Sequence, residues 1–461
     1  MRNSERMEAG LMVSPLTVLV RGVVEWTFPL GFTALFEEHA QRKWTRKLTI
    51  NAIVWLMLQV VAGARKSVFA AFQADQSEAT PTIEATYQAL YGKLGRLNVE
   101  FSEALVQTSA ERLQPLLEAA GCRWYSGWKN YRVRILDGTD TAGTEHRLRV
   151  LQKIKAAGLP ARFVVEYDAA TGLCTQVVAS EDAYASERTL VRKILARATA
   201  NDLFVADRFY CTTDFMAAVV LKQAFAVVRE HAGHLRILSE GKRKKRGKID
   251  TGTVYEQTIE VEDTETGETW RWRRIIIHLT EPTREGEMEI RLITNLPTKV
   301  HARRVAALYR KRWTLERHFD FLKNCLHAEI ESLGRPSAAV FAMCMSLVTA
   351  NALAAIKQAL RFSHGEEEFE KLSGYYLADE VAGNYRAIDT LIRQSTWRHL
   401  SVLAPRRFWR WMGKVASHVR TRAFHKHPRG PKNPHKPKRA SGKQRHHYST
   451  YRLLNEEKQI C

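Results

Sequence analysis

The chain has 461 residues, of which 45% are apolar, and a formal net charge of +22. This is enough apolar material for two or three domains with hydrophobic cores. The excess charge lies toward the C-terminal end, because no Asp or Glu occurs between Asp389 and Glu456, and it indicates a polyanionic partner such as nucleic acid. The six scattered cysteines form no C-x-x-C pair, which argues against a structural zinc site. With a charged rather than apolar beginning of the chain, they predict free thiols in a reducing cytoplasm.

Two apolar stretches are candidates for membrane spans. Residues 50–64 are too few to cross a bilayer, and Lys47 and Arg65 lie close to their ends. Residues 337–356 are numerous enough, but they include Ser, Thr, Asn and many small residues, and no second span accompanies them. We therefore predict a buried helix at each position and no membrane association.

Residues 1–125 have helical periodicity and few strand signals. Between Thr80 or Thr82, which supply a helix start, and Gly121, which supplies a stop, Leu and Phe recur at steps of three and four residues. This predicts an all-helical domain, to which we assign DNA binding. Both a helix-turn-helix and other helical hairpins are compatible with the pattern.

After about residue 130 the pattern changes to short apolar runs and alternation of period two. A strand ending at Asp137 is followed by a hairpin over residues 162–180, a helix that begins after Ser186, a strand ending at Asp207, and then a helix and a further strand. Helices between strands predict parallel pairing. We therefore expect an α/β domain over residues 126–355, with a mixed sheet and helices on both faces.

A strand-rich insertion interrupts this domain at about residues 231–299. It begins with the basic sequence SEGKRKKRGKID, which we predict to be a loop, and its alternating remainder predicts two or three antiparallel strands. Helical periodicity resumes at about Val300. A helical region is predicted over residues 356–420. The basic tail over residues 421–461 is rich in Pro, Gly and Lys, and we predict it to be disordered when unbound.

The segment YRKRWTLERHFDFLK places cations and aromatic residues around a single glutamate. On a helix at about 100° per residue, four of its side chains fall within a sector of about 60°, namely Tyr309, Arg312, Glu316 and Lys323. Such a face suits phosphate binding, with Glu316 available to hold a metal. The alternative from this segment alone is a solvated helix in which Arg312 and Glu316 form an i, i+4 ion pair.

The predicted strand ends favour the metal-binding interpretation. Asp137 and Asp207 each end a strand, and ligands gather at the carboxyl ends of strands in an open α/β sheet. With Glu316 they supply three oxygen ligands, whose mutual repulsion a divalent cation would relieve. We expect two Mg²⁺ ions, with Mn²⁺ able to replace them, that activate a water or a 3′-hydroxyl for phosphodiester chemistry.

Other acidic residues compete for these roles. Asp140 is either a turn partner or the true ligand, and we favour Asp137 because it directly follows the apolar run. Asp168 is predicted to be a hairpin turn residue, and Asp214 to cap or start a helix.

Taken together, these residues resemble a known family. The segment from Tyr309 to Lys323 fits the spacing Y-x2-R-x3-E-x6-K, which is similar to that of the insertion-sequence transposases of the YREK-motif group. These are DDE enzymes with an RNase H-like catalytic fold. The segments ILDGTD and LFVADRFY resemble those that bear the family's two aspartates, and LITNLP resembles the strand leading out of its β-rich insertion. The resemblance covers about residues 130–355.

The resemblance implies a role for each matching residue. It makes Asp137, Asp207 and Glu316 the catalytic, metal-binding triad, and it makes Tyr309, Arg312 and Lys323 the residues that hold the DNA end. It also implies that the strands ending at Asp137 and Asp207 are neighbours. Some members have a tryptophan where this chain has Ile290, so Trp270 or Trp272 would have to substitute for it in a hairpin step.

The implied function is that of a cut-and-paste DNA transposase. Such an enzyme binds terminal inverted repeats, hydrolyses the phosphodiester at the transposon end as an endonuclease, and joins the freed 3′-hydroxyl to target DNA. We expect a homodimer in the DNA complex and a cytoplasmic, nucleoid-associated location in a bacterium. The alternatives are an RNase H-like nuclease without strand transfer and a transposase-derived DNA-binding regulator without catalysis.

Overall fold

The computed structural model describes residues 3–29, 31–39, 47–78, 81–141, 148–152, 158–283, 286–427 and 447–460. Its strands are β1 (Arg132–Asp140), β2 (Gly158–Leu159), β3 (Arg162–Asp168), β4 (Cys174–Ser180), β5 (Asp202–Ala206), β6 (Phe225–Arg229), β7 (Arg236–Glu240), β8 (Lys244–Ile249), β9 (Gly252–Glu262), β10 (Thr269–Leu279), β11 (Glu289–Thr294) and β12 (Tyr448–Ser449).

Ten of these strands form one mixed sheet. The order is β4-β3-β1-β5-β6-β11-β10-β9-β7, and β8 pairs with β9 outside this path. The chain runs through the β3–β4 hairpin, crosses back as α9 (Glu187–Ala196), and enters β5 parallel to β1, with Ile135 opposite Val205. The predicted hairpin, the predicted helices and the predicted parallel pairing are all present.

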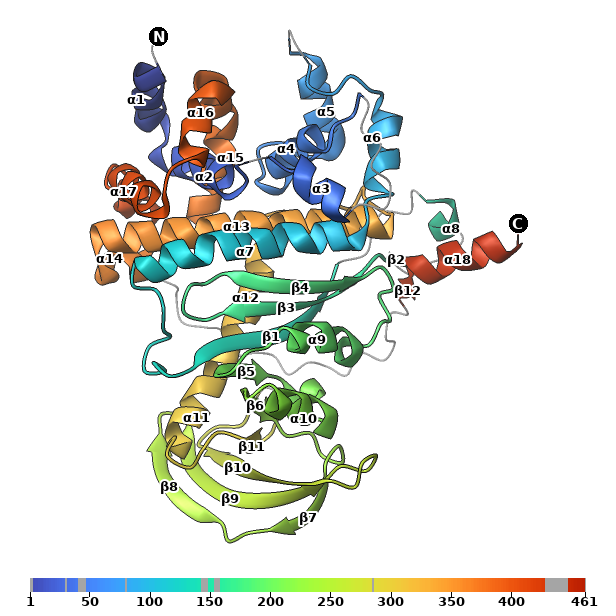
Figure 1. Cartoon of the computed structure of the whole chain (residues 1–461), viewed down its shortest axis with the longest axis vertical. Helices are drawn as coiled ribbons and strands as arrows, with labels where there is room; N and C mark the ends of the chain where they lie inside the picture. The colour runs from blue at the N-terminus through green and yellow to red at the C-terminus, as the bar shows by residue number, and fades with distance from the viewer. Residues whose placement is uncertain are drawn as a thin grey trace.

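Successive residues of the central strands point into two different cores. Ile135 and Val205 pack with the N-terminal helices and the long helix α13 (Pro336–His364), whereas Leu136 and Phe204 pack with α9 and α10 (Thr213–Leu221). Helices therefore cover both faces of the sheet (Figure 1). This arrangement confirms the predicted mixed α/β fold class with a β-strand insertion and flanking helical regions.

Seven α-helices precede the sheet and seven follow the insertion before the C-terminal strand, within the described ranges. The first group is α1 (Asn3–Val13), α2 (Pro15–Thr27), α3 (Thr33–His39), α4 (Ile50–Val61), α5 (Val68–Gln76), α6 (Tyr87–Leu94) and α7 (Val99–Ala119). After α11 (Ala302–Tyr309) and α12 (Trp313–Cys325), the later group continues from α13 with α14 (Glu366–Lys371), α15 (Gly374–Leu391), α16 (Gln394–Ser401) and α17 (Pro405–Ala416). Short α8 (Arg149–Gln152) and α18 (Thr450–Ile460) complete the α-helices of the described ranges.

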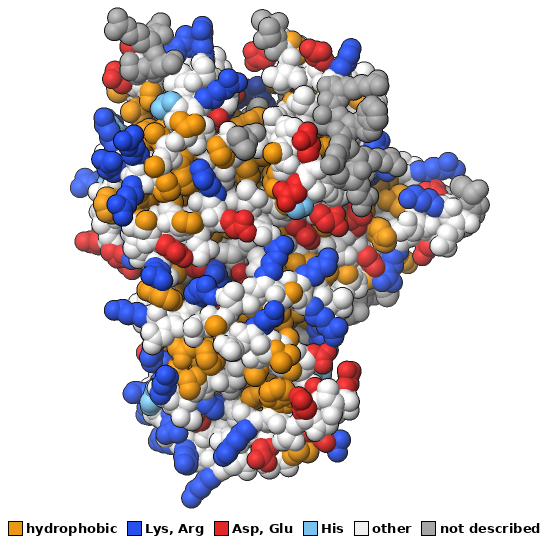
Figure 2. All heavy atoms as spheres, viewed as in Figure 1, with side chains coloured by type: hydrophobic (Ala, Val, Ile, Leu, Met, Phe, Trp, Pro, Cys, Tyr) orange, Lys and Arg blue, Asp and Glu red, His pale blue; other side chains and the backbone are white. Residues whose placement is uncertain are grey.

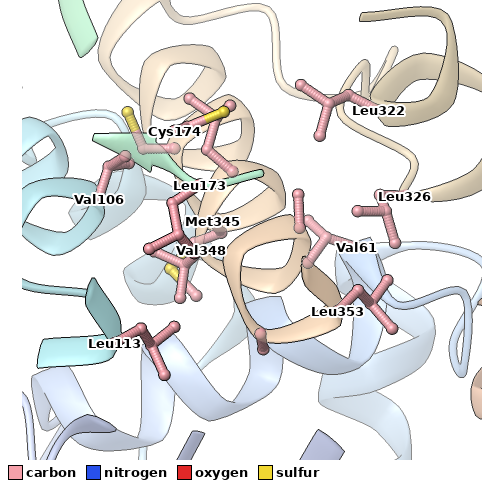
Figure 3. Close-up of a cluster of buried hydrophobic side chains, with 14 of the residues drawn as sticks. Val61, Val106, Leu113, Leu173, Cys174, Leu322, Leu326, Met345, Val348 and Leu353 are labelled. Carbon is pink, nitrogen blue, oxygen red and sulfur yellow. The ribbon is translucent and has the colours of Figure 1, made fainter. Parts of the chain in front are cut away.

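The helix α13 is the centre of the helical layer. It is apolar and long enough to cross a membrane, but 94% of its most apolar window is buried inside the protein, as predicted for residues 337–356. It packs along α7 and also contacts α2, α4 and α17. Figure 3 shows side chains from α4, α7, α12 and α13 in one buried cluster with Leu173 and Cys174 at the start of β4. The predicted domain boundary at residue 355 therefore lies inside one continuous helix.

Two local predictions were wrong. The basic sequence predicted as a loop contains β8, which pairs antiparallel with β9 and has a register shift between Lys245 and Gly247. In the tail predicted to be disordered, residues 450–460 form α18, which contacts α8, and β12 pairs in parallel with β2. Residues 428–446 of that tail lie outside the described residues. The five described cysteines are free, as predicted.

Asn351 of α13 joins the helical layer to the sheet. Its side chain is fully buried, its Oδ1 accepts from the Cys174 backbone N–H at 2.8 Å, and its Nδ2 donates to the Cys174 carbonyl at 3.0 Å and to Ser109 Oγ of α7 at 2.8 Å. Buried polar groups that lose their partners cost about 1–3 kcal/mol each.

We therefore expect Asn351→Ala to lower the free energy of unfolding by about 3 kcal/mol or more, measured by urea denaturation. The substitution leaves the buried backbone N–H and carbonyl of Cys174 without these hydrogen-bond partners. The matched control is Asn384→Ala on α15, where the amide of a partly buried asparagine donates to the Glu380 backbone carbonyl of the same helix. Equal losses for the two variants would contradict the role assigned to Asn351.

Candidate active site

The two predicted aspartates come together where β1 and β5 separate. The parallel pairing of β1 with β5 ends at Ile135 and Val205, while β1 continues to Asp140 paired only with β3. Asp137 thus lies within β1 rather than at its end. Asp207 directly follows β5 and caps a 3-10 turn (Arg208–Tyr210), where its Oδ1 accepts from the Phe209 N–H at 2.8 Å. The divergence of the strands opens the carboxyl end of the sheet to a ligand.

Arg312 links Asp137 to Glu316. Its Nη1 lies 3.3 Å from Asp137 Oδ2, and its Nη2 lies 2.5 Å from Glu316 Oε1. The side chains of Arg312 and Asp137 are 12% and 15% exposed, whereas Glu316 is 45% exposed. The i, i+4 pair predicted as the simpler alternative is therefore present, but its arginine is also bound to a carboxylate from the sheet.

The segment that bears these residues is not one helix. α11 ends at Tyr309, a 3-10 turn spans Arg310–Arg312, and α12 begins at Trp313. α11 packs on β8, β9 and β10, whereas α12 packs on β1, α13 and α15. The two helices pack on different surfaces of the protein, and the chain turns between them. The prediction that Tyr309, Arg312, Glu316 and Lys323 share one helical face assumed a continuous helix, which is not present.

Tyr309 and Lys323 occupy opposite ends of this segment. The Tyr309 ring is buried, and burial raises the pKa of its hydroxyl to about 12, with Arg312 and Asp207 close enough to influence it. Lys323 in the last turn of α12 donates to the Asp140 carbonyl at 3.2 Å and pairs with Glu329 at 2.9 Å. The structure therefore gathers Asp137, Asp207, Tyr309, Arg312 and Glu316, whereas Lys323 is bound to protein groups nearby.

Burial raises the pKa of the Asp137 carboxyl to about 7. The positive charge of Arg312 opposes this rise, and the negative charges of Asp207, Glu316 and Glu187 add to it. A carboxylate in this position is short of positive charge, because one guanidinium serves both Asp137 and Glu316. Such a site favours an additional cation.

The donor set fits a divalent cation in chemistry but not in its present arrangement. Asp137, Asp207 and Glu316 offer hard oxygen ligands. Across the part of the chain that the structure describes, however, no three His, Cys, Asp or Glu side chains lie close enough together to hold a metal ion as they stand. Glu316 would have to leave Arg312, and since its side chain is half exposed it can rotate without unpacking a core.

A fourth carboxylate, that of Glu187, was not predicted from the sequence. It accepts from the Tyr210 hydroxyl at 3.0 Å and from Arg162 Nη1 at 2.9 Å. A Cβ added to Gly138 would lie 2.1 Å from the Glu187 Cδ, so the Glu187 carboxylate in this position requires a glycine beside Asp137. The glycine directly after the aspartate was the one sequence signal for this close approach.

The competing acidic residues have other partners. Asp140 is paired with Arg162, whose Nη2 lies 3.1 Å from its Oδ2. Asp168 accepts from the N–H groups of Ala170 and Thr171 in the hairpin turn, and Asp214 lies in the first turn of α10, both as predicted. Trp272 is buried in the core and stacks near Trp270 with ring centroids 6.4 Å apart.

Residues 128–351 match the family model of the transposase DDE domain. This region is similar to the transposase DDE domain. The matched range contains β1 to β11, α11, α12 and half of α13, together with all six predicted site residues. No curated protein matches the chain.

Proteins with a transposase DDE domain are nucleases or transposases that act on DNA. DDE transposases normally use divalent metals. These statements agree with the predicted DDE transposase family, and the assignment to the YREK-motif group stays a prediction.

The raised pKa of Asp137 predicts a pH-dependent gain of stability in Asp137→Asn. Between about pH 4 and pH 7 the folded protein holds a proton on Asp137 that the unfolded chain releases, so this carboxyl destabilises the fold progressively as the pH rises through 7. We expect Asp137→Asn to be more stable than the parent at pH 8 by at most about 4 kcal/mol, with little difference at pH 4. The lost Arg312 contact reduces this gain.

Urea denaturation at both pH values measures this difference. The control is Asp250→Asn, at a side chain 94% exposed, for which we expect little change at either pH. An Asp137→Asn variant that is no more stable than the parent at pH 8 would contradict the buried, negatively charged environment described for this residue.

Proposed function

We propose that the chain is a cut-and-paste DNA transposase of the YREK-motif group. It would bind terminal inverted repeats, cleave the phosphodiester at the transposon end and join the 3′-hydroxyl to target DNA, in the cytoplasm. A second copy of the chain would hold the second end, giving a homodimer on DNA.

The observation that supports this proposal most is the position of Arg312. It joins Asp137 and Glu316, two residues 179 positions apart in sequence, next to Asp207, at the open end of the parallel strands. The residues of the predicted triad and the arginine of the predicted DNA-binding set thus belong to one electrostatic unit.

The residues have separate tasks in this proposal. Asp137, Asp207 and Glu316 would hold two Mg²⁺ ions, or Mn²⁺ in their place, and a divalent cation supplies the charge that activates an attacking oxygen and stabilises a leaving one. Arg312 would transfer from the carboxylates to a DNA phosphate, since a guanidinium binds either partner in the same bidentate geometry. Tyr309 and Lys323 would hold the DNA end on either side.

Loss of any triad carboxylate is expected to abolish cleavage while DNA binding remains. The substrate is a supercoiled plasmid that contains the coding segment of this chain with its flanking DNA. Asp137→Asn, Asp207→Asn and Glu316→Gln should each fail to nick it with Mg²⁺, and removal of the metal with a chelator should stop nicking by the parent. Gel electrophoresis measures nicking, and fluorescence anisotropy measures binding.

The matched control is Asp320→Asn, one turn beyond Glu316 on the same helix and exposed, which should nick normally. Nicking by a triad variant at the parent's rate would remove that residue from the site. Cleavage without joining of pre-nicked ends to a target plasmid would identify a nuclease instead, and DNA binding without metal-dependent cleavage would identify a regulator.

Arg312 is expected to compete with the cation. Without DNA, Arg312→Gln should bind Mn²⁺ about tenfold more tightly than the parent, because the carboxylates lose their resident positive charge, an effect of about 1.4 kcal/mol. Electron paramagnetic resonance of free Mn²⁺ measures this affinity.

The control is Lys311→Gln, which removes the same charge from an exposed neighbour and should leave the affinity within about twofold of the parent. Weaker Mn²⁺ binding by Arg312→Gln would show that the arginine supports the metal site rather than competing for it.

A further inference from the structure

The helix α17 is fixed to the protein by one apolar face. Phe408 and Met412 are fully buried, and the Phe408 ring stacks on Trp26 of α2 with centroids 4.7 Å apart. The helix contacts α13, α2 and α7. The opposite face of α17 therefore points to solvent while the helix is held against α2, α7 and α13.

The outer face of α17 consists of cations. Arg406, Arg407, Arg410 and Lys414 are all exposed. At about 100° per residue they fall within a sector of about 100°, and steps of four residues along the row correspond to about 6 Å. They form the α17 basic face.

The positive charges of the α17 basic face are not paired with carboxylates among the described residues. None of its four side chains takes part in an ion pair or hydrogen bond recorded among the described residues, and the sequence has no acidic residue between Asp389 and Glu456. Like charges three and four residues apart destabilise a helix, and Arg406 and Arg407 also lie in the first turn, where the helix dipole disfavours cations. An external polyanion would remove both costs.

The basic face lies apart from the catalytic carboxylates. α17 is on the opposite side of the α7 and α13 layer from the sheet (Figure 1). Figure 2 shows Lys and Arg side chains gathered over the part of the surface where Figure 1 places α17. A ligand of this face would not contact Asp137 or Glu316.

We propose that the α17 basic face binds the phosphate backbone of double-stranded DNA, independently of base sequence, as a second duplex contact outside the active site. This inference rests on the proposed function for the presence of DNA, and it adds a surface that the catalytic residues do not require. Evenly spaced cations without acidic neighbours suit phosphates, since they neutralise charge and release counterions.

The burial of the apolar side of α17 argues against a membrane as the partner. A helix that lies on a bilayer inserts its apolar face into the lipid. In α17 that face is buried against α2 and α13, and the exposed residues of the helix are Pro405 and the four cations. Duplex DNA, which needs charge alone, is the better match.

The test is binding of the full chain to a duplex of arbitrary sequence, measured by fluorescence anisotropy over a range of salt concentrations. The variant replaces all four cations (Arg406→Gln, Arg407→Gln, Arg410→Gln, Lys414→Gln). We expect affinity at low salt to fall at least about tenfold and the slope of log K against log salt to shrink by about 3 to 4, at about 0.9 per phosphate contact. Its melting temperature should equal or exceed the parent's, because like-charge repulsion is relieved.

The control removes four exposed cations elsewhere (Arg192→Gln, Lys222→Gln, Arg236→Gln, Arg271→Gln) and so has the same net charge. An unchanged slope in the α17 variant, or an equal loss in the control, would overturn the inference. So would retained DNA binding accompanied by lost binding to anionic phospholipid vesicles, which would identify a membrane as the partner. Absence of DNA binding by the parent chain would instead count against the proposed function. If the α17 variant nicks DNA normally and its slope of log K against log salt is unchanged, only this inference fails.

Discussion

The parallel pairing of β1 with β5 is the constraint on which the candidate site depends. It brings Asp137 of β1 close to Asp207, which directly follows β5 and is 70 positions away in sequence. The pairing ends at Ile135 and Val205, so Asp137 lies beyond the last residue of β1 that pairs with β5. Burial then raises the pKa of Asp137, and the nearby carboxylates raise it further. Arg312 supplies the only positive charge paired with Asp137 among the described residues. The site thus has a deficit of positive charge that a divalent cation bound by the carboxylates would relieve. Arg312 would then be free to pair with a DNA phosphate.

The helical layer supports the candidate site through α12, the helix that bears Glu316. α12, which bears Glu316, packs on β1 with one part of its surface and on α13 and α15 with another. α13 in turn is fixed to β4 and α7 through Asn351 and a wide apolar contact. A helix apolar enough to cross a membrane is therefore used as internal support, and the N-terminal helices, the sheet and the later helices share one core. The rigid part of the site is the sheet, and the half-exposed Glu316 is the part free to move.

Much of this arrangement followed from the sequence because local and long-range patterns agreed. Short apolar runs ending near acidic residues predicted the strands, and the intervening helix at residues 187–196 predicted their parallel pairing. The break at Arg310–Arg312 was not predicted, since the segment contains neither Pro nor Gly and the turn arises from two different packing surfaces. β8 was missed because its six residues are mostly cations, and only pairing with β9 makes them a strand. Glu187 was missed because its partners, Tyr210 and Arg162, come from other elements.

The most direct test is a crystal structure of the chain with transposon-end DNA and Mn²⁺, in which anomalous scattering locates the ion. We predict a Mn²⁺ peak bound by carboxylate oxygens of Asp137 and Asp207, with Glu316 turned toward it and Arg312 on a DNA phosphate. A peak elsewhere, with Arg312 still bridging Asp137 and Glu316 while DNA occupies the site, would contradict the account.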